Sequence, residues 1–420
     1  MPTVTDPAGS GTSEDLPETE DLAKIQVQPE DAQQRPEGAR RVAALLVCCT
    51  VLGLAGTDLV LPAVPGLPEA LGGTVGQAQL VLATFAAGSG IGLLLFGELG
   101  ARLDNRRMLV IALCLYGVLS AAAAFSSSLM LLIALRFLQG VAASCAAVVT
   151  PGIIRALFDE RGALRALAAL GSIESLAPAI APIVGVWLLK AYGWQASFWV
   201  TAVLAMLLAV SVFVASARIP MVTGNPSRLG YWLLLRNREF QRYAFSAGSS
   251  LGSLLVFVFA MPAVFVAAYG GEIRDFIIMQ LLGISTYIVA ANLASRLVHR
   301  FGEEATILGG SLITLFGSLL MLAYGLSGGR EPWVIWLLFI PFNTGFGFRG
   351  PPAFFCALKA SNGDDARGSA LIFLYIMFIT AASTAAVAPF VTLGLWPAAL
   401  AASALAGVSV LLHLPFRADR

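Results

Sequence analysis

The sequence is poor in charged side chains. Asp, Glu, Lys and Arg together make up 12% of its 420 residues, whereas 58% of the residues are hydrophobic. A soluble globular chain carries about 25% charged residues, so this chain has too little charge to cover a water-exposed surface. Its net charge of +1 provides no basic surface, and we expect no nucleic-acid partner. The composition therefore predicts an integral membrane protein.

The usual signatures of cofactor and metal chemistry are also missing. The sequence has no Gly-x-x-x-x-Gly-Lys-Ser/Thr stretch, so ATP is not expected to be an energy source. Its two histidines, His299 and His413, are predicted to lie far apart and offer no metal site. The five cysteines all fall within apolar runs, which leaves no disulfide framework outside the membrane. We therefore expect neither an enzyme nor a cofactor.

Long apolar runs dominate what is present. Each is long enough to cross about 30 Å of hydrocarbon as a helix, and none shows the alternation of a β-barrel strand. We predict twelve spans: 42–63, 78–99, 108–126, 129–154, 163–189, 196–217, 242–268, 275–298, 304–326, 333–358, 367–390 and 393–416. The fold class is thus an all-α membrane protein.

The positive charges predict the orientation of these spans. Of the 26 Lys and Arg residues, two lie deep within spans (Arg136 and Arg349), three lie in loops on one side, and the other 21 lie on the opposite side or at the helix ends there. The side rich in Lys and Arg is the cytoplasmic one, so both termini are predicted to be cytoplasmic. Residues 1–40 contain nine acidic and three basic residues without apolar periodicity, and we expect a disordered cytoplasmic tail.

The longest internal connection, 218–241, divides the spans into two sets of six. We therefore predict bundles at 41–217 and 242–416, joined by a cytoplasmic linker that either only connects them or lies on the membrane surface. An internal repeat supports this division, because GELGARLDNRR at 97–107 resembles ANLASRLVHRF at 291–301. Two six-helix halves with a binding site between them are typical of transporters.

Several stretches resemble known patterns of membrane transporters. They are GTDLVLPAVPGL in the first span, ALRFLQGVAAS in the fourth, SLAPAIAPIVGVWL in the fifth, GWQASFWV before the sixth and NLASRLVHRFG after the eighth. Together they resemble the major facilitator superfamily over residues 40–416, and most closely its twelve-span drug:proton antiporters of the bicyclomycin/chloramphenicol-resistance type. The resemblance implies two parallel six-helix bundles that export small molecules in exchange for protons by alternating access.

The loop after the second span departs from the pattern of that family. The family reads Gly-x-Leu-x-Asp-Arg-x-Gly-Arg-Arg, but here Ala101 stands at the Asp position and Asp104 at the Gly position. That Asp helps to hold the two halves together on the cytoplasmic side in the family. Either Glu98 or Asp104 takes its place here, or the outward-facing state is held less strongly. The conformational residues implied by this loop and by the proline-glycine pattern of the fifth span are Gly97, Arg102, Asp104, Arg106, Pro178, Pro182 and Gly185.

Ionisable residues within spans are usually functional, and Asp58 and Arg136 are two of them. At about 1.5 Å per residue, Asp58 lies in the outer half of the first span and Arg136 in the outer half of the fourth, so the two side chains could approach. We assign both to proton coupling and Asp58 also to substrate binding. The alternatives for Asp58 are a structural ion pair or a position near the outer membrane interface. The alternative for Arg136 is a clamp on backbone carbonyls, with Gln139 as its neighbour.

Glu174 and Arg349 lie at similar depths in opposite halves. We assign Glu174, which precedes Pro178 by four residues, to binding a proton or a cationic substrate; the alternative is a carboxylate satisfied between helices. Arg349 lies in the irregular stretch NTGFGFRGPPAFF, and we assign it to an anionic substrate group, although it could instead neutralise Glu174. Tyr116 and Phe346 are assigned to an aromatic wall of the site, with plain packing as the alternative.

Two transport functions and one other remain open at this point. The resemblance favours a multidrug exporter of neutral or cationic compounds in the inner membrane, and Arg349 favours a dedicated exporter of an anionic metabolite such as a siderophore. A membrane sensor or scaffold without transport is the third possibility. The expected partners are a small-molecule substrate, protons and the lipid bilayer, and the resemblance implies a monomer.

Overall fold

The computed structural model describes residues 36–100, 103–221, 230–361 and 365–414, and all of the regular structure in them is helical. The predicted tail up to residue 35 and the predicted conformational residue Arg102 lie outside these ranges. The first helix begins at Pro36, five residues before the predicted start of the first bundle. Several helices begin with a side-chain cap, as at Ser128, Asp159 and Asn237, whose side chains accept bonds from the first free backbone N–H groups.

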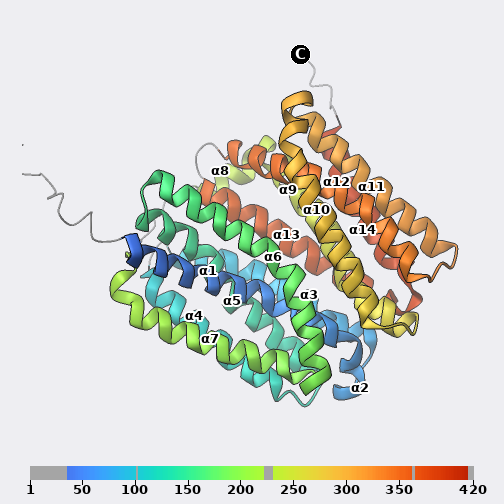
Figure 1. Cartoon of the computed structure of the whole chain (residues 1–420), viewed down its shortest axis with the longest axis horizontal. Coiled ribbons are helices and arrows are strands. Elements are labelled where there is room, and N and C mark those ends of the chain that lie inside the picture. Colours follow the sequence, from blue (N-terminus) through green and yellow to red (C-terminus); the bar gives the residue numbers. More distant parts are fainter. Residues whose placement is uncertain (1–35, 101–102, 222–229, 362–364, 415–420) are drawn as a thin grey trace, which may run out of the picture.

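The first half of the chain forms one bundle, drawn in blue to green in Figure 1. Its elements are α1 (Pro36–Asp58), η3 (Leu61–Gly66), α2 (Leu67–Leu71), α3 (Val75–Gly100), α4 (Asn105–Ala124), α5 (Leu129–Leu157), α6 (Glu160–Tyr192), α7 (Gln195–Ala215) and η4 (Ser216–Arg218). Helix α5 packs against α1, α3 and α4, and α7 packs against α4, so α5 lies at the centre of this bundle.

The second half forms the other bundle, drawn in yellow to red in Figure 1. Its elements are α9 (Arg238–Ala263), η5 (Val264–Ala268), α10 (Ile273–Phe301), α11 (Glu303–Leu326), α12 (Pro332–Lys359), α13 (Asp365–Val387), η6 (Ala388–Leu393) and α14 (Leu395–His413). Between the bundles, the short helix α8 (Gly230–Arg236) lies within the predicted linker and buries Leu234.

Eleven helices of the described chain are long and apolar enough to span a membrane. Helix α12 is not among the eleven although it has 28 residues. It carries Asn343 and Arg349 in its middle, and these two polar side chains lower its hydropathy. Eleven of the twelve predicted spans therefore correspond to helices of suitable length and apolarity. The tenth predicted span, 333–358, is also a helix, but a more polar one.

The two bundles meet along two pairs of helices. Helix α3 packs against α13, and α6 packs against α10. In chain order α3 and α6 are the second and fifth long helices of the first half, and α10 and α13 are the second and fifth of the second half. Each half therefore contributes helices at equivalent positions. Such an arrangement is expected for a duplicated unit whose halves face each other across a binding site.

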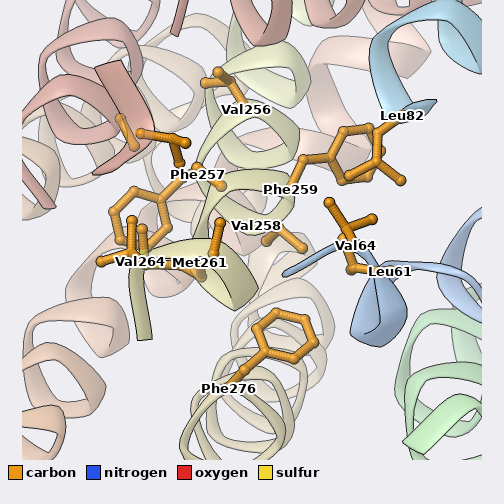
Figure 2. Packing of buried hydrophobic residues seen from close by; sticks show 14 of the residues in the cluster. Leu61, Val64, Leu82, Val256, Phe257, Val258, Phe259, Met261, Val264 and Phe276 are labelled. Carbon is orange, nitrogen blue, oxygen red and sulfur yellow. The ribbon is translucent and has the colours of Figure 1, made fainter. Parts of the chain in front are cut away.

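Buried apolar side chains seal one end of the interface between the bundles. Figure 2 shows Leu61 and Val64 of η3 facing Val258 and Phe259 of α9, with Phe276 of α10 beside them. All five side chains are 6% exposed or less. Helix α1 runs from the end with the termini toward η3, so this seal lies at the end of the molecule opposite the termini.

Candidate functional site

A cavity of about 1650 Å³ lies between the two bundles. Residues of α1, α3, α5 and α6 line it from the first bundle, and residues of α9, α10, α12 and α13 line it from the second. Leu82 and Phe259 belong both to its wall and to the apolar seal. At the other end its wall reaches Glu98, Arg155 and Arg367, near the helix ends on the side of the termini. The cavity therefore extends from the sealed end to the end that carries the termini.

Asp58 lies on the wall of this cavity as the last residue of α1. The regular helix ends here because Pro62, four residues on, lacks the N–H that would continue the bonding, and a 3₁₀ segment follows. The next carbonyl, Leu59 O, accepts a bond of 2.9 Å from Ser197 Oγ. A Cβ on Gly185 of α6 would lie 2.5 Å from the same oxygen. The predicted conformational residue Gly185 thus allows α6 to pack directly against the turn that carries Asp58.

Arg136 is buried, but it supports the backbone near Asp58 instead of pairing with the carboxylate. Its Nε donates to Val81 O at 3.2 Å, and one Nη donates to Gly56 O at 3.3 Å. Its guanidinium also lies 4.1 Å from the centre of the Phe85 ring. In the described chain no ion pair joins Arg136 to Asp58, so the structure favours the carbonyl-clamp interpretation over a direct pair.

Gln139 and Tyr116 complete the surroundings of Arg136. Gln139 Oε1 accepts a bond of 3.4 Å from Arg136, and Gln139 Nε2 donates to Ser120 Oγ at 2.9 Å, as the spacing of three residues predicts. Tyr116 is 1% exposed and does not line the cavity; a Cβ on Gly56 would overlap its hydroxyl. Tyr116 therefore packs under the end of α1 and is not part of the cavity wall in this conformation.

Glu174 is the second carboxylate on the same half of the cavity wall. It lines the cavity together with Pro178, one turn further along α6, and its carboxylate lies near Thr50 of α1. Thr50 precedes Asp58 by eight residues on the same helix, which corresponds to about 12 Å along the axis. The two carboxylates are therefore placed at different depths, one near the sealed end and one closer to the termini. Pro182 lies one turn beyond Pro178 within the same helix.

The opposite wall carries aromatic and amide side chains among aliphatic ones. Phe346, predicted from the sequence, lines the cavity, and its ring lies 5.4 Å from that of Tyr287. Sequence reasoning missed Tyr287, Gln280 and Asn343, which also line the cavity. The spacing contains the signal: Asn343 and Phe346 are three residues apart on α12, and Gln280 and Tyr287 are seven apart on α10, so each pair shares one helix face.

Arg349 does not reach this wall. It is 1% exposed and donates from Nε to Ser311 Oγ at 2.9 Å and from Nη2 to Ser246 Oγ at 2.7 Å. No ion pair with Glu174, or with any other carboxylate of the described ranges, accompanies these bonds. In this conformation Arg349 is therefore part of the interior of the second bundle and is not in contact with the cavity.

The loop after α3 is held within the first bundle. Asp104 caps α4 and forms an ion pair of 3.1 Å with Arg106, which also donates to Ser216 O beyond α7. Partial burial alone would raise the pKa of Asp104, but the bonds from Arg106 and the charges of Arg106 and Arg107 lower it overall. Asp104 thus joins parts of one half. The predicted conformational residue Gly97 lines the cavity, and a Cβ on it would lie 3.0 Å from the Tyr231 hydroxyl of the linker helix.

Comparison with known proteins relates the chain to one protein family. The family model of the Major Facilitator Superfamily matches residues 46–387. A bicyclomycin resistance protein homolog of Haemophilus influenzae is 28% identical over 60% of this chain. An uncharacterised transporter of the same superfamily from Bacillus subtilis is 30% identical over 66% of this chain and 72% of its own length. A chloramphenicol resistance protein of Pseudomonas aeruginosa is 29% identical over 64% of this chain. The chain spans 65% of the length of the Haemophilus and Pseudomonas relatives.

Solved structures agree in fold. A D-xylose–proton symporter superposes with a TM-score of 0.64 at 15% identity, covering 88% of this chain and 96% of the symporter. A transporter of the POT family superposes with a TM-score of 0.71 at 13% identity, covering 89% and 96% of the two chains. Because the family model matches most of its length, the chain belongs to the Major Facilitator Superfamily.

Proposed function

We propose that this protein is a proton-coupled secondary transporter that exports lipophilic cationic or neutral compounds by drug:proton antiport. The observation that carries the proposal is the cavity, in which Asp58 and Glu174 of one half face aromatic and amide side chains of the other. Carboxylates bind protons and cations, and aromatic faces attract flat organic cations. The names of the relatives, which refer to resistance to bicyclomycin and chloramphenicol, support the same class of cargo.

The membrane topology belongs to this proposal. We take α12 as the twelfth membrane span, because it packs between α10 and α11 along its length and is long enough to cross the bilayer. The excess of Lys and Arg on the side of the termini assigns that side to the cytoplasm. With this orientation the cavity opens toward the cytoplasm. We place the protein in the inner membrane, as a monomer.

The proposed cycle uses the two carboxylates at different depths. Asp58, next to the seal, takes a proton when the halves rock and open the outer end, and it releases the proton when the cavity faces the cytoplasm. Cargo enters from the cytoplasm and occupies the space between Glu174 and Phe346. Proton and cargo favour opposite protonation states of the acidic wall, so the binding of one weakens the binding of the other.

Export of an anionic metabolite has less support. That hypothesis depends on Arg349, which lies off the cavity and donates to two serine hydroxyls. The described cations that do line the cavity, Arg155 and Arg367, lie near its open end. The deeper wall carries carboxylates, which repel an anion.

The test uses the purified full chain in proteoliposomes with an imposed pH gradient and ethidium as a fluorescent cationic probe. We expect the parent protein to accumulate ethidium against its gradient and Asp58→Asn to abolish that accumulation, because an amide cannot exchange a proton. We expect Glu174→Gln to weaken transport of ethidium more than export of uncharged chloramphenicol. Its carboxylate attracts only the cationic probe.

Glu69→Gln is the matched control, because Glu69 is an exposed carboxylate of α2 at the same end of the molecule as Asp58. It should transport like the parent. Gradient-driven accumulation by Asp58→Asn at the rate of the parent would rule out the assigned role of Asp58. An absence of flux of either probe with the folded parent protein would count against drug export.

A further inference from the structure

A chain of hydrogen bonds crosses the second bundle away from the cavity. Arg349 donates from Nη2 to Ser246 Oγ at 2.7 Å, and the same oxygen lies 2.9 Å from His413 Nε2. On the other side of the imidazole ring, His413 Nδ1 lies 3.2 Å from Glu304 Oε2. The four residues come from four different helices, α12, α9, α14 and α11. None of them lines the cavity, so the proposed transport cycle does not use them.

The two ends of this chain differ in their access to solvent. The Glu304 side chain is 50% exposed, whereas the His413 side chain is fully buried. Arg349 is also buried, and its described partners are uncharged hydroxyls. Glu304 is therefore the point at which this buried chain meets solvent. The described charged or titratable groups that face His413 from the helices packed around it are Arg242 and Tyr243 of α9, Glu304 of α11 and Arg349 of α12.

Two hydrogen-bonding patterns satisfy these groups. With a neutral ring, Nδ1–H donates to Glu304, and Nε2 accepts from the Ser246 hydroxyl, whose oxygen in turn accepts from Arg349. With a protonated ring, Nε2–H also donates to Ser246, and the serine hydrogen turns to Ser409 Oγ, which is 3.0 Å away. In this second pattern two cations share one serine oxygen, and the ring also donates to Glu304, whose other carboxylate oxygen binds Arg242 and Tyr243.

We propose that the Glu304–His413 pair is a proton-binding site of the second bundle, separate from Asp58, and that Ser246 couples its occupancy to Arg349. Arg349 follows the cavity residue Phe346 by three positions, which is less than one helical turn. A proton bound at the pair therefore acts on the helix that forms one wall of the cavity. The site itself is independent of the proposed transport, and only its effect on transport rests on that proposal.

The experiment is a pH titration of the histidine rings by NMR, with the full chain in lipid nanodiscs and isotope label only in histidine. The chain has two histidines, and His299 is exposed at the end of α10, so His299→Gln leaves the His413 signal alone. We expect this signal to report a neutral Nδ1–H ring at high pH and a doubly protonated ring at low pH. Replacing a neighbouring charge should move the midpoint by about one pH unit.

The direction of each shift follows from the sign of the charge removed. Arg349→Gln should move the midpoint to higher pH, because a neighbouring cation is lost, and Glu304→Gln should move it to lower pH. Arg300→Gln, which removes an exposed cation of α10, is the matched control and should leave it unchanged. If Arg349→Gln does not fold, Ser246→Ala takes its place and should shift the midpoint by removing the shared hydroxyl.

Several outcomes would overturn the proposal. One is a His413 ring that stays neutral at every pH at which the protein remains folded, and another is a midpoint that does not respond to Arg349 or Ser246 variants. The measurement needs no transport. If the His413 midpoint responds to these variants but the protein transports neither ethidium nor chloramphenicol, the proton site is supported and only the transport function is contradicted.

Discussion

At the scale of single residues, the position of Asp58 depends on groups that fix the backbone on both sides of it. Arg136 holds Gly56 O, and Ser197 holds Leu59 O. The buried cation thus acts through the turn that carries the carboxylate and leaves the carboxylate itself facing the cavity. In the proposed cycle, a site built in this way would keep the acid in place while its protonation changes.

The close contact at Gly185 gives a prediction at this scale. In Gly185→Ala the new Cβ would lie 2.5 Å from Leu59 O, so α6 or the turn after Asp58 must move. We expect a loss of about 1–3 kcal/mol in the free energy of unfolding and slower transport of ethidium. Thermal unfolding in detergent and the proteoliposome assay would measure these effects.

Gly171→Ala is the matched control in the same helix, because a Cβ at Gly171 meets nothing within 4 Å. It should fold at least as stably as the parent, since alanine favours a helix by up to about 1 kcal/mol over glycine. Equal stability and equal transport for the two variants would contradict the role given to the contact at Gly185.

At the scale of the elements, α11 and α12 pack with their backbones in close contact. A Cβ on Gly310 would lie 2.7 Å from Gly345 O and 2.9 Å from the Arg349 backbone nitrogen, and one on Gly317 would lie 2.6 Å from the backbone of Phe342. Small residues at such positions let membrane helices approach. This contact places Arg349 of α12 within bonding distance of Ser311 of α11.

Adjacent glycines of α11 make this packing testable. Gly310→Ala should destabilise the protein by about 1–3 kcal/mol through overpacking, whereas Gly309→Ala should be neutral or stabilising, because its Cβ would meet nothing within 4 Å. Thermal unfolding of the two variants is the measurement. A Gly310→Ala variant as stable as Gly309→Ala would show that the two helices pack less closely than described.

At the scale of the whole molecule, the cavity extends to one end of the bundle interface and is sealed at the other. Leu61 and Val64 of the first half meet Val258 and Phe259 of the second at the seal, so both halves must part there before the cavity can open on that side. The broken end of α1, with its two prolines, supplies half of the seal.

Accessibility to a charged maleimide tests this arrangement in a chain whose five native cysteines are replaced. A maleimide reacts with the thiolate, which forms where water reaches the thiol. Leu54 lines the cavity, so Leu54→Cys should be labelled from the cytoplasmic side. Val64→Cys, within the seal, and Leu207→Cys, exposed on α7 outside the cavity, should both label slowly. Inside-out and right-side-out vesicles separate the two sides. Labelling of Leu54→Cys only from the outside would reverse the proposed orientation.

Much of the fold could be predicted from the sequence, because membrane helices need long apolar runs. The predicted spans 78–99 and 129–154 fall within α3 and α5, and the family was correctly identified from local motifs. The span around Arg349 was also predicted as a helix, although its polar residues set it apart in composition. Helix ends were less accurate, as at α6, which begins before and ends after the predicted 163–189.

The site was only partly predictable. Asp58, Glu174 and Phe346 were predicted to face a cavity and do so, whereas Tyr116 and Arg349 do not reach it. An ionisable residue in an apolar run indicates that a polar partner or a cavity exists, but the run contains no information about which of the two the side chain faces.

By itself, the sequence determined the class of this protein: a helical membrane chain with two similar halves and a few ionisable residues that hydrocarbon cannot accommodate. Only the tertiary structure decided what surrounds each of those residues. Arg136 binds carbonyls of other helices, Arg349 binds serines of other helices, and His413 meets Glu304 across more than 100 residues of chain. The physical reason is that apolarity and helix periodicity are local properties of a segment, whereas the partner of a buried charge depends on which helices pack together and how closely their glycines allow them to approach.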